Sequence, residues 1–120
     1  MDVVVGGLEL APQACLIDSG ATAIRMGSHV AELIGLDLTG APTQVIAAGG
    51  ARVEGRMATV SLEIDDGESS HRWEAPVWFC EPWRPAFGLL GLTGFLDYFV
   101  VTLAAYEEWL ELRPVADAGG

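Results

Sequence analysis

Basic residues and long hydrophobic runs are both scarce in this chain of 120 residues. It has six lysines and arginines against 17 aspartates and glutamates, so its formal net charge is −11. Such an acidic surface repels phosphate groups, which disfavours binding to nucleic acids and docking on anionic membranes. The longest apolar stretches, such as residues 99–106, are far shorter than the ~20 residues that a membrane-spanning helix needs.

Cysteine is rare, and the first residues do not have the pattern of a targeting segment. The first residues, MDVVVGGLEL, have no basic region and no long apolar core, so we expect no signal peptide. Cys15 and Cys80 lie in apolar runs, which predicts buried, reduced thiols and a cytoplasmic protein. These cysteines and the two histidines, His29 and His71, lack ligand-like spacing, so we expect no metal and no cofactor.

The composition predicts one globular domain. Hydrophobic residues make up 51% of the chain, which is enough to bury a single core. We expect the domain to span residues 1–114. The final residues 115–120, VADAGG, are typical of a disordered tail.

Short strands dominate the expected secondary structure, because apolar residues alternate or cluster briefly between glycine-rich turns. The expected strands are 3–5, 8–10, 14–17, 22–26, 43–47, 53–64, 73–79, 87–90, 99–103 and 108–112. A helix is expected over 28–34, capped by Ser28 and ended by Gly35, and another over 93–98. This pattern favours an all-β, closed, barrel-like domain with one or two short helices.

The stretch CLIDSGATAIRMG, residues 15–27, places a carboxylate directly after an apolar run. Taken alone, Asp18-Ser19-Gly20 is ordinary turn chemistry, since Asp and Ser side chains bond nearby backbone groups. Its context favours a further role, because the apolar run delivers Asp18 from the interior. Gly20 is expected to permit a backbone turn that residues with a Cβ resist.

Three segments of the chain fit together as one set of motifs: LIDSGAT at residues 16–22, TQVIAAGGARVEG at residues 43–55, and LLG at residues 89–91, followed by LTGFLDYF. In these segments the chain resembles the aspartic proteases, and most closely the bacterial single-lobe, retropepsin-like members of that family. The first segment matches the motif of the catalytic aspartate, the second falls where the family has its flap hairpin, and the third matches the hydrophobic-hydrophobic-Gly element that precedes a short helix. The resemblance implies an acid-protease single lobe with a flap.

The resemblance also implies a reaction that needs two carboxylates sharing one proton. The chain has no second Asp-Ser/Thr-Gly sequence, since Asp37 is separated from Thr39-Gly40 by Leu38. The second carboxylate must therefore come from Asp18 of another copy, which a two-fold symmetric homodimer would supply. The implied activity is that of an aspartic endopeptidase acting on a polypeptide substrate, and a monomer would be inert.

Roles for neighbouring residues follow from the same resemblance. The hydroxyl of Ser19 would brace the two active-site loops across the dimer, and Gly20 and Ala21 would keep the turn tight beside the substrate. Leu90 and Gly91 would pack against the aspartate loop and support it.

The flap residues complete the set that the resemblance implies. Ala48, Gly49 and Gly50 would form the flap tip, where a glycine pair suits a mobile lid that brings its backbone close to a peptide. The peptide itself would bind as an added strand, with its side chains in alternating pockets.

Other functions remain open on the sequence alone. A protease-fold module that binds peptides or dimerises without cleaving them is the main alternative, and an unrelated β domain is another. A Cys–His nucleophile is disfavoured because Cys15 lies in a strand that is expected to be buried. Intact Asp18-Ser19-Gly20 favours the enzyme, since a degenerate relative would be expected to lose the aspartate first.

Overall fold

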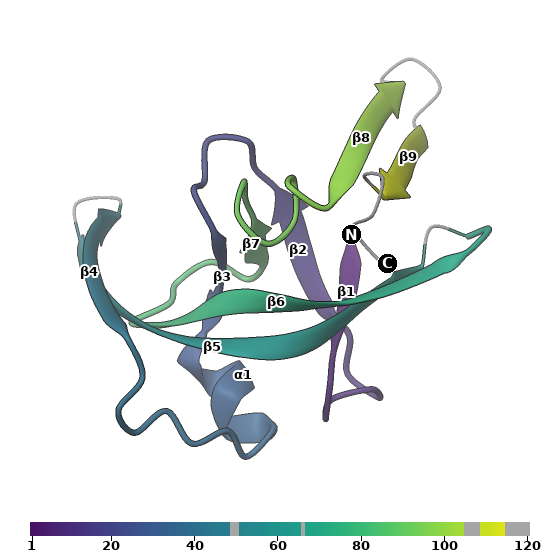
Figure 1. The fold of residues 1–120 in the computed structure, drawn as a ribbon. Helices are drawn as coiled ribbons and strands as arrows, with labels where there is room; N and C mark the ends of the chain where they lie inside the picture. The colour runs from purple at the N-terminus through teal and green to yellow at the C-terminus, as the bar shows by residue number, and fades with distance from the viewer. Residues whose placement is uncertain (49–50, 66, 105–108, 115–120) are drawn as a thin grey trace.

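The computed structural model describes residues 1–48, 51–65, 67–104 and 109–114, and this part of the chain forms nine strands and one short helix (Figure 1). In chain order the elements are β1 (Asp2–Val5), β2 (Gln13–Ile17), β3 (Ile24–Gly27), α1 (Ser28–Leu33), β4 (Thr43–Ala48), β5 (Ala51–Asp65), β6 (Ser70–Glu81), β7 (Gly88–Leu90), β8 (Phe99–Ala104) and β9 (Trp109–Pro114).

Six of these strands close into a barrel, which confirms the predicted all-β, barrel-like fold. The main sheet has the order β1-β2-β7-β3-β6-β5-β4, and an additional pairing of β1 with β5 joins its two sides. In that pairing Val4 lies opposite Glu63 and Val5 opposite Leu62. Strand β4 pairs with β5 outside the closed ring, so it extends the sheet as an edge strand.

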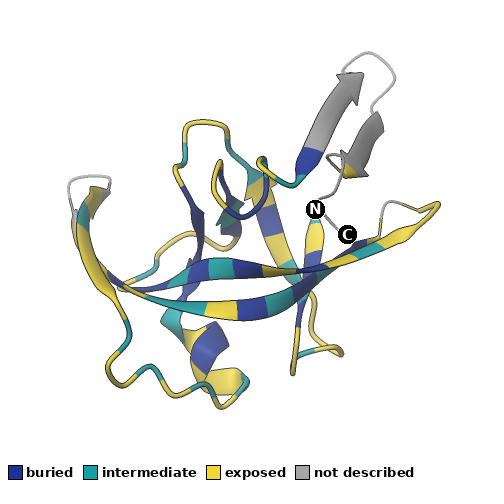
Figure 2. Ribbon diagram, in the orientation of Figure 1, coloured by how far each residue is buried: buried dark blue, intermediate teal, exposed yellow. Residues whose placement is uncertain are grey.

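The core lies between the long strands β5 and β6 and the rest of the barrel. Buried and more exposed residues alternate along both strands, as the banded colouring in Figure 2 shows. Such a period of two is the pattern of strands with one buried face, and it confirms the alternation predicted from the sequence. The largest fully buried side chains include Phe79, Phe95, Ile24 and Met26.

Strand β7 occupies the position that matters most for the candidate site. It lies between β2 and β3, parallel to β2 and antiparallel to β3. Its register places Leu89 opposite Leu16 on one side and opposite Arg25 on the other. Segments that are more than 60 residues apart in the sequence, 15–17 and 88–90, therefore lie side by side.

The predicted helix forms, but it does not begin as expected. Ser28 is its first residue, and Gly27, in an extended conformation, precedes it with no side-chain cap. A glycine fits at 27 because a Cβ there would collide with the ring of His29. The predicted end is confirmed, since Gly35 has a φ of +69° and its N–H bonds back to the carbonyl of Glu32.

Two other elements were predicted wrongly. Residues 8–10 form no strand, because β1 pairs with β2 instead and leaves Leu10 fully exposed in the connection. Residues 93–98 form a series of turns rather than a helix. Gly94 has a φ of +95°, which interrupts helical geometry, and the N–H of Thr93 bonds to Thr22 in another segment.

The C-terminal strands β8 and β9 pair with each other, as predicted, but they do not close the barrel. They form a separate antiparallel sheet, which projects from the barrel in Figure 1. The tail predicted over residues 115–120 lies outside the described residues. No helix in the described part of the chain is long and apolar enough to cross a membrane.

Candidate active site

Asp18 lies at the end of β2, where the chain leaves the barrel. The preceding Ile17 is the last residue paired with β7, opposite Leu90. The N–H of Asp18 continues this pairing, because it donates to the carbonyl oxygen of Leu90 at 3.0 Å. The backbone of the aspartate is therefore anchored to a strand that the whole barrel holds in place.

A tight turn follows Asp18 and positions its carboxylate. Oδ1 accepts a hydrogen bond from the N–H of Gly20 at 2.9 Å, and the carbonyl of Asp18 accepts one from Ala21 at 3.1 Å. Among the described residues the carboxylate has no other hydrogen-bond partner. The φ of Gly20 is outside the left-handed region, so glycine is not required there for the reason predicted. A Cβ at this position would instead lie 3.2 Å from Oδ1, tight against the carboxylate.

Gly91 packs beneath the aspartate turn with no room for a side chain. A Cβ at this position would lie 2.4 Å from the carbonyl oxygen of Ala23 and 2.6 Å from that of Ala21. The next residues extend the contact, because the N–H of Leu92 bonds to the carbonyl of Ala21 at 2.9 Å. The structure thus places Leu90 and Gly91 directly against the turn that carries Asp18.

Asp18 opens onto a cleft of about 590 Å³ between the barrel and the hairpin of β4 and β5. The floor and ends come from the aspartate turn, β3, β7 and the proline-rich connection after β6. The residues lining it are Asp18, Gly20, Ala21, Thr22, Arg25, Ile46, Ala47, Val53, Pro82, Trp83, Arg84, Pro85 and Leu89. Most are apolar, as is usual for sites that bind part of a larger molecule.

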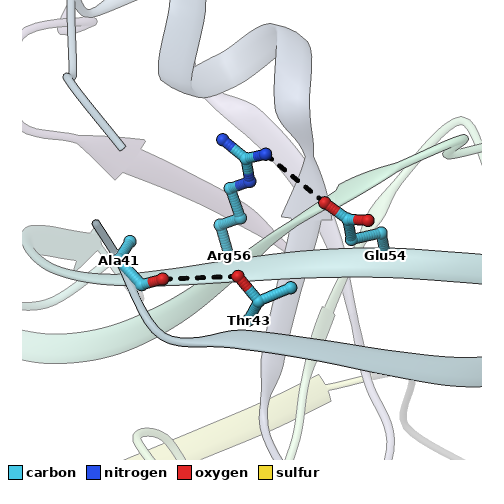
Figure 3. Close-up of polar contacts among 4 residues, drawn as sticks. All are labelled: Ala41, Thr43, Glu54 and Arg56. Carbon is cyan, nitrogen blue, oxygen red and sulfur yellow. Dashed lines mark hydrogen bonds and ion pairs between the residues drawn. The ribbon is translucent and has the colours of Figure 1, made fainter. Parts of the chain in front are cut away.

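The β4–β5 hairpin covers this cleft in the region predicted to be the flap. Its register runs from Thr43 opposite Arg56 to Ala48 opposite Ala51. Gly49 and Gly50, the predicted tip, lie outside the described residues. Figure 3 shows polar contacts at the base of the hairpin, where Arg56 meets Glu54 at 3.5 Å and Thr43 Oγ1 donates to the carbonyl of Ala41 at 3.3 Å.

Arg25 and Trp83 line the cleft but were not predicted as site residues. Arg25 interrupts an apolar run, AIRMG, and this single charge was the available signal for it. Only 7% of the residue is exposed, and Nη2 donates to Oε1 of Gln44 at 3.1 Å. Trp83 follows Pro82 in a connection whose path the sequence pattern does not specify.

The other nucleophile considered from the sequence is poorly placed. Cys15 and Cys80 are free and buried, which confirms the prediction of two buried thiols. Burial raises the pKa of Cys15 to about 11, so the reactive thiolate is scarce at neutral pH. Ser19 is exposed beside Asp18 and makes no side-chain hydrogen bond within the described residues.

Comparison with known proteins agrees with this geometry. The family described as aspartyl protease matches residues 1–93, which include Asp18, the hairpin and the segment 89–91. A search among proteins of curated function finds no match to this sequence.

A similar solved structure is the crystal structure of a retropepsin-like aspartic protease from Rickettsia conorii. The two chains superpose with a TM-score of 0.60 and share 18% sequence identity, over 93% of this chain and 79% of the other. At this identity the similarity concerns the fold. Together with the family match over most of the sequence, it shows that this chain belongs to the aspartyl protease family and has a retropepsin-like fold.

Proposed function

We propose that residues 1–114 form the protease domain of a homodimeric aspartic endopeptidase, in which two copies of Asp18 share one proton. The observation that carries this proposal is the placement of Asp18. Its backbone is held by Leu90, its turn rests on Gly91, and its carboxylate faces an apolar cleft. Among the described residues that line this cleft, Asp18 is the single acid, so a second carboxylate has to come from a partner.

The proposed chemistry is hydrolysis of a peptide bond by water. One Asp18 carboxylate, acting as base, takes a proton from water as its oxygen bonds to the scissile carbonyl carbon. The other, protonated, donates a hydrogen bond to the carbonyl oxygen and stabilises its developing charge. The C–N bond then breaks while the leaving nitrogen receives a proton, and the pair regains its single shared proton.

Apolar side chains around Asp18 support a dimer on this face. Leu16, two residues before Asp18, is 50% exposed, and Leu92, whose N–H bonds to the aspartate turn, is 49% exposed. Burying them against a second copy would be favourable. Ser19 is exposed at the same face, where its hydroxyl would be available to the partner's loop.

A polypeptide in extended conformation is the substrate that suits this cleft. Ile46, Ala47 and Val53 of the hairpin oppose Leu89 and the aspartate turn across it. A strand placed between them would use backbone hydrogen bonds for affinity and apolar pockets for selectivity. The buried, unpaired thiols are compatible with the cytoplasmic setting that we propose.

The test is cleavage of a diverse peptide library from acid to neutral pH by the wild-type protein and by Asp18→Asn. Sedimentation would establish the size of both proteins. We expect cleavage by the wild-type dimer, with a bell-shaped pH profile because only the singly protonated pair is active. We expect none from an Asp18→Asn protein that is still dimeric. A folded dimer that cleaves nothing would favour the peptide-binding module instead.

A further inference from the structure

We propose that Arg25, assisted by Arg84, forms a subsite for a carboxylate of the bound peptide, so that this protein selects acidic substrates. This inference rests on the proposed peptidase function and names its substrate class. Both arginines line the cleft that contains Asp18. They are two of the six basic residues in a chain whose formal net charge is −11.

Arg25 is a cation whose burial is not compensated within the described residues. It lies on β3 between Ile24 and Met26, which both point into the core, so its own side chain leaves β3 on the opposite face. Nη2 bonds to the neutral amide oxygen of Gln44, whereas Nη1 is buried and has no hydrogen-bond partner. The Cys80 thiol also lies against this side chain, but burial raises the pKa of Cys80, so it supplies no negative charge. A buried charge without a counter-ion costs free energy, which an incoming carboxylate would offset.

Two other described arginines have a counter-ion, whereas the exposed Arg52 of the hairpin forms no ion pair within the described residues. Arg56 pairs with Glu54 at 3.5 Å, and Arg72 pairs with Glu63 at 3.1 Å. Neither Arg25 nor Arg84 forms an ion pair within the described residues. Acidic residues outnumber basic ones almost threefold, yet the buried Arg25 has no ion-pair partner, and Asp18 is the single acid among the described residues that line its cleft.

The position of Arg25 matches that of a substrate contact. It lies opposite Leu89 of β7, the strand that also holds the backbone of Asp18. Its bond to Gln44 links the floor of the cleft to strand β4 of the hairpin. A peptide lying between hairpin and floor would bring its side chains close to this guanidinium. There a carboxylate can accept two parallel N–H bonds, which are strong when shielded from water.

The experiment compares peptides that differ only by Glu or Gln, placed in turn at each position around a cleavable bond. The measured quantity is the ratio of kcat/KM for the two peptides. For the wild-type protein we expect a preference for Glu of about 10-fold or more at one position, as befits a charged hydrogen bond. Arg25→Met should bring this ratio close to one, and Arg84→Gln should reduce it.

The matched control is Arg72→Gln, which removes the same charge outside the cleft and should leave the ratio unchanged. Because each ratio is measured on one protein sample, partial unfolding of Arg25→Met does not alter it. A wild-type ratio near one at every position would overturn the proposal, even if Arg25→Met failed to fold. So would a Glu preference that survives in folded Arg25→Met. Peptides ending in a free acid or an amide distinguish a side-chain carboxylate from a terminal one.

Binding separates this inference from the peptidase proposal. Fluorescence anisotropy of labelled Glu and Gln peptides on the Asp18→Asn protein measures recognition without cleavage. In one outcome the wild-type protein cleaves no peptide, yet Asp18→Asn binds the Glu peptide more tightly than the Gln peptide. If the double variant Asp18→Asn/Arg25→Met then binds both peptides equally, the subsite proposal is supported and the peptidase proposal is overturned. Cleavage with equal affinity and equal kcat/KM for both peptides would leave the peptidase and overturn the subsite. If the protein neither binds nor cleaves these peptides, both the subsite and the peptidase proposals are overturned.

Discussion

Two clefts of similar size lie on this protein. They differ in the charge of their side chains and in the backbone contacts that hold their aspartates in place. The Asp18 cleft has about 590 Å³ and contains one acid and two arginines. The other has about 640 Å³ and lies near the N-terminus, lined by Met1, Asp2, Val4, Pro12, Glu63, Ile64, Asp65 and Ser70. We call the latter the acidic cleft, because its side chains include three carboxylates and no arginine. Volume alone would favour the acidic cleft, so volume is a poor guide here.

The comparison shows which feature sets Asp18 apart from other aspartates. Asp18 accepts a hydrogen bond from the N–H two residues ahead, but Asp37 and Asp65 do the same, at 2.9 and 2.8 Å. This local turn is therefore common in the chain and marks no site by itself. Asp18 differs because its own N–H is held by β7 and because Gly91 packs under its turn.

The largest expected effect contrasts Asp18→Asn with Asp65→Asn in the acidic cleft. Asparagine retains an oxygen for the turn bond in both variants, so both proteins should fold. Loss of the shared proton should lower kcat/KM on a cleavable peptide by on the order of 10³-fold or more for Asp18→Asn. Asp65→Asn should cleave like the wild type. Equal activity of the two variants would contradict the assignment of the active site.

The next largest effect compares two glycines, Gly91 under the Asp18 turn and Gly67 in the exposed turn that follows Asp65 of the acidic cleft. In Gly91→Ala the new methyl group would clash with backbone atoms of Ala21 and Ala23, which cannot move as a side chain would. We expect a loss of about 3 kcal/mol or more in the free energy of unfolding, measured by urea denaturation. Gly67→Ala, with a φ of +92° but open space around it, should cost only about 1 kcal/mol. Similar losses in the free energy of unfolding for the two variants would show that the packing of Gly91 under the aspartate turn is no tighter than that of an exposed turn.

A third prediction concerns β2, which connects the two regions. Cys15, three residues before Asp18, exchanges two backbone hydrogen bonds with Met1. Met1 lines the acidic cleft. Burial raises the pKa of the Cys15 thiol to about 11, from about 9 in an exposed thiol. Between these values the unfolded chain loses the thiol proton and the folded chain keeps it, so stability falls as pH rises.

The free energy of unfolding should fall by about 1.4 kcal/mol per pH unit between about pH 9 and pH 11, and this thiol should cause no such fall below that range. Urea denaturation of the wild type and of Cys15→Ala, from neutral pH to pH 11, would measure it as a difference between the proteins. Cys15→Ala should lose stability less steeply above pH 9. Parallel curves would indicate that the thiol ionises equally in both states.

The smallest effect is expected at the edge of the acidic cleft. Arg72 pairs with Glu63 at 3.1 Å, but its side chain is 70% exposed. Exposed ion pairs of this kind contribute little, so Arg72→Gln should change the free energy of unfolding by less than about 0.5 kcal/mol. Chemical denaturation at low salt would detect the change. A larger loss would mean that the acidic cleft depends on this pair to offset its carboxylates.

Local patterns predicted most of the elements correctly. Alternation along β5 and β6, and the short apolar runs that became β2 and β7, are visible because side-chain direction repeats every two residues. The predictions failed where a distant partner decided the conformation. Residues 8–10 form no strand because β1 pairs with β2 instead, and residues 93–98 are held as turns by contacts with Thr22 and the core.

The candidate site was predicted only in part, for a related reason. The Asp18 motif and the segment 89–91 are each a continuous stretch of sequence, so the resemblance of each to a family motif could be recognised without a structure. Arg25 gave only one isolated signal, a charge in an apolar run. Its significance depends on the bond to Gln44, the unpaired Nη1 and the neighbouring aspartate turn, which come from other strands.

The sequence by itself determined the all-β class, the buried thiols, the acidic charge and the identity of the candidate catalytic aspartate. These properties depend on composition, on short periodic patterns or on a contiguous motif. The tertiary structure decided how β1 and β5 close the barrel and how β7 enters between β2 and β3. It also decided which arginines share a cleft with Asp18, because strand order and register bring residues far apart in the chain within contact distance.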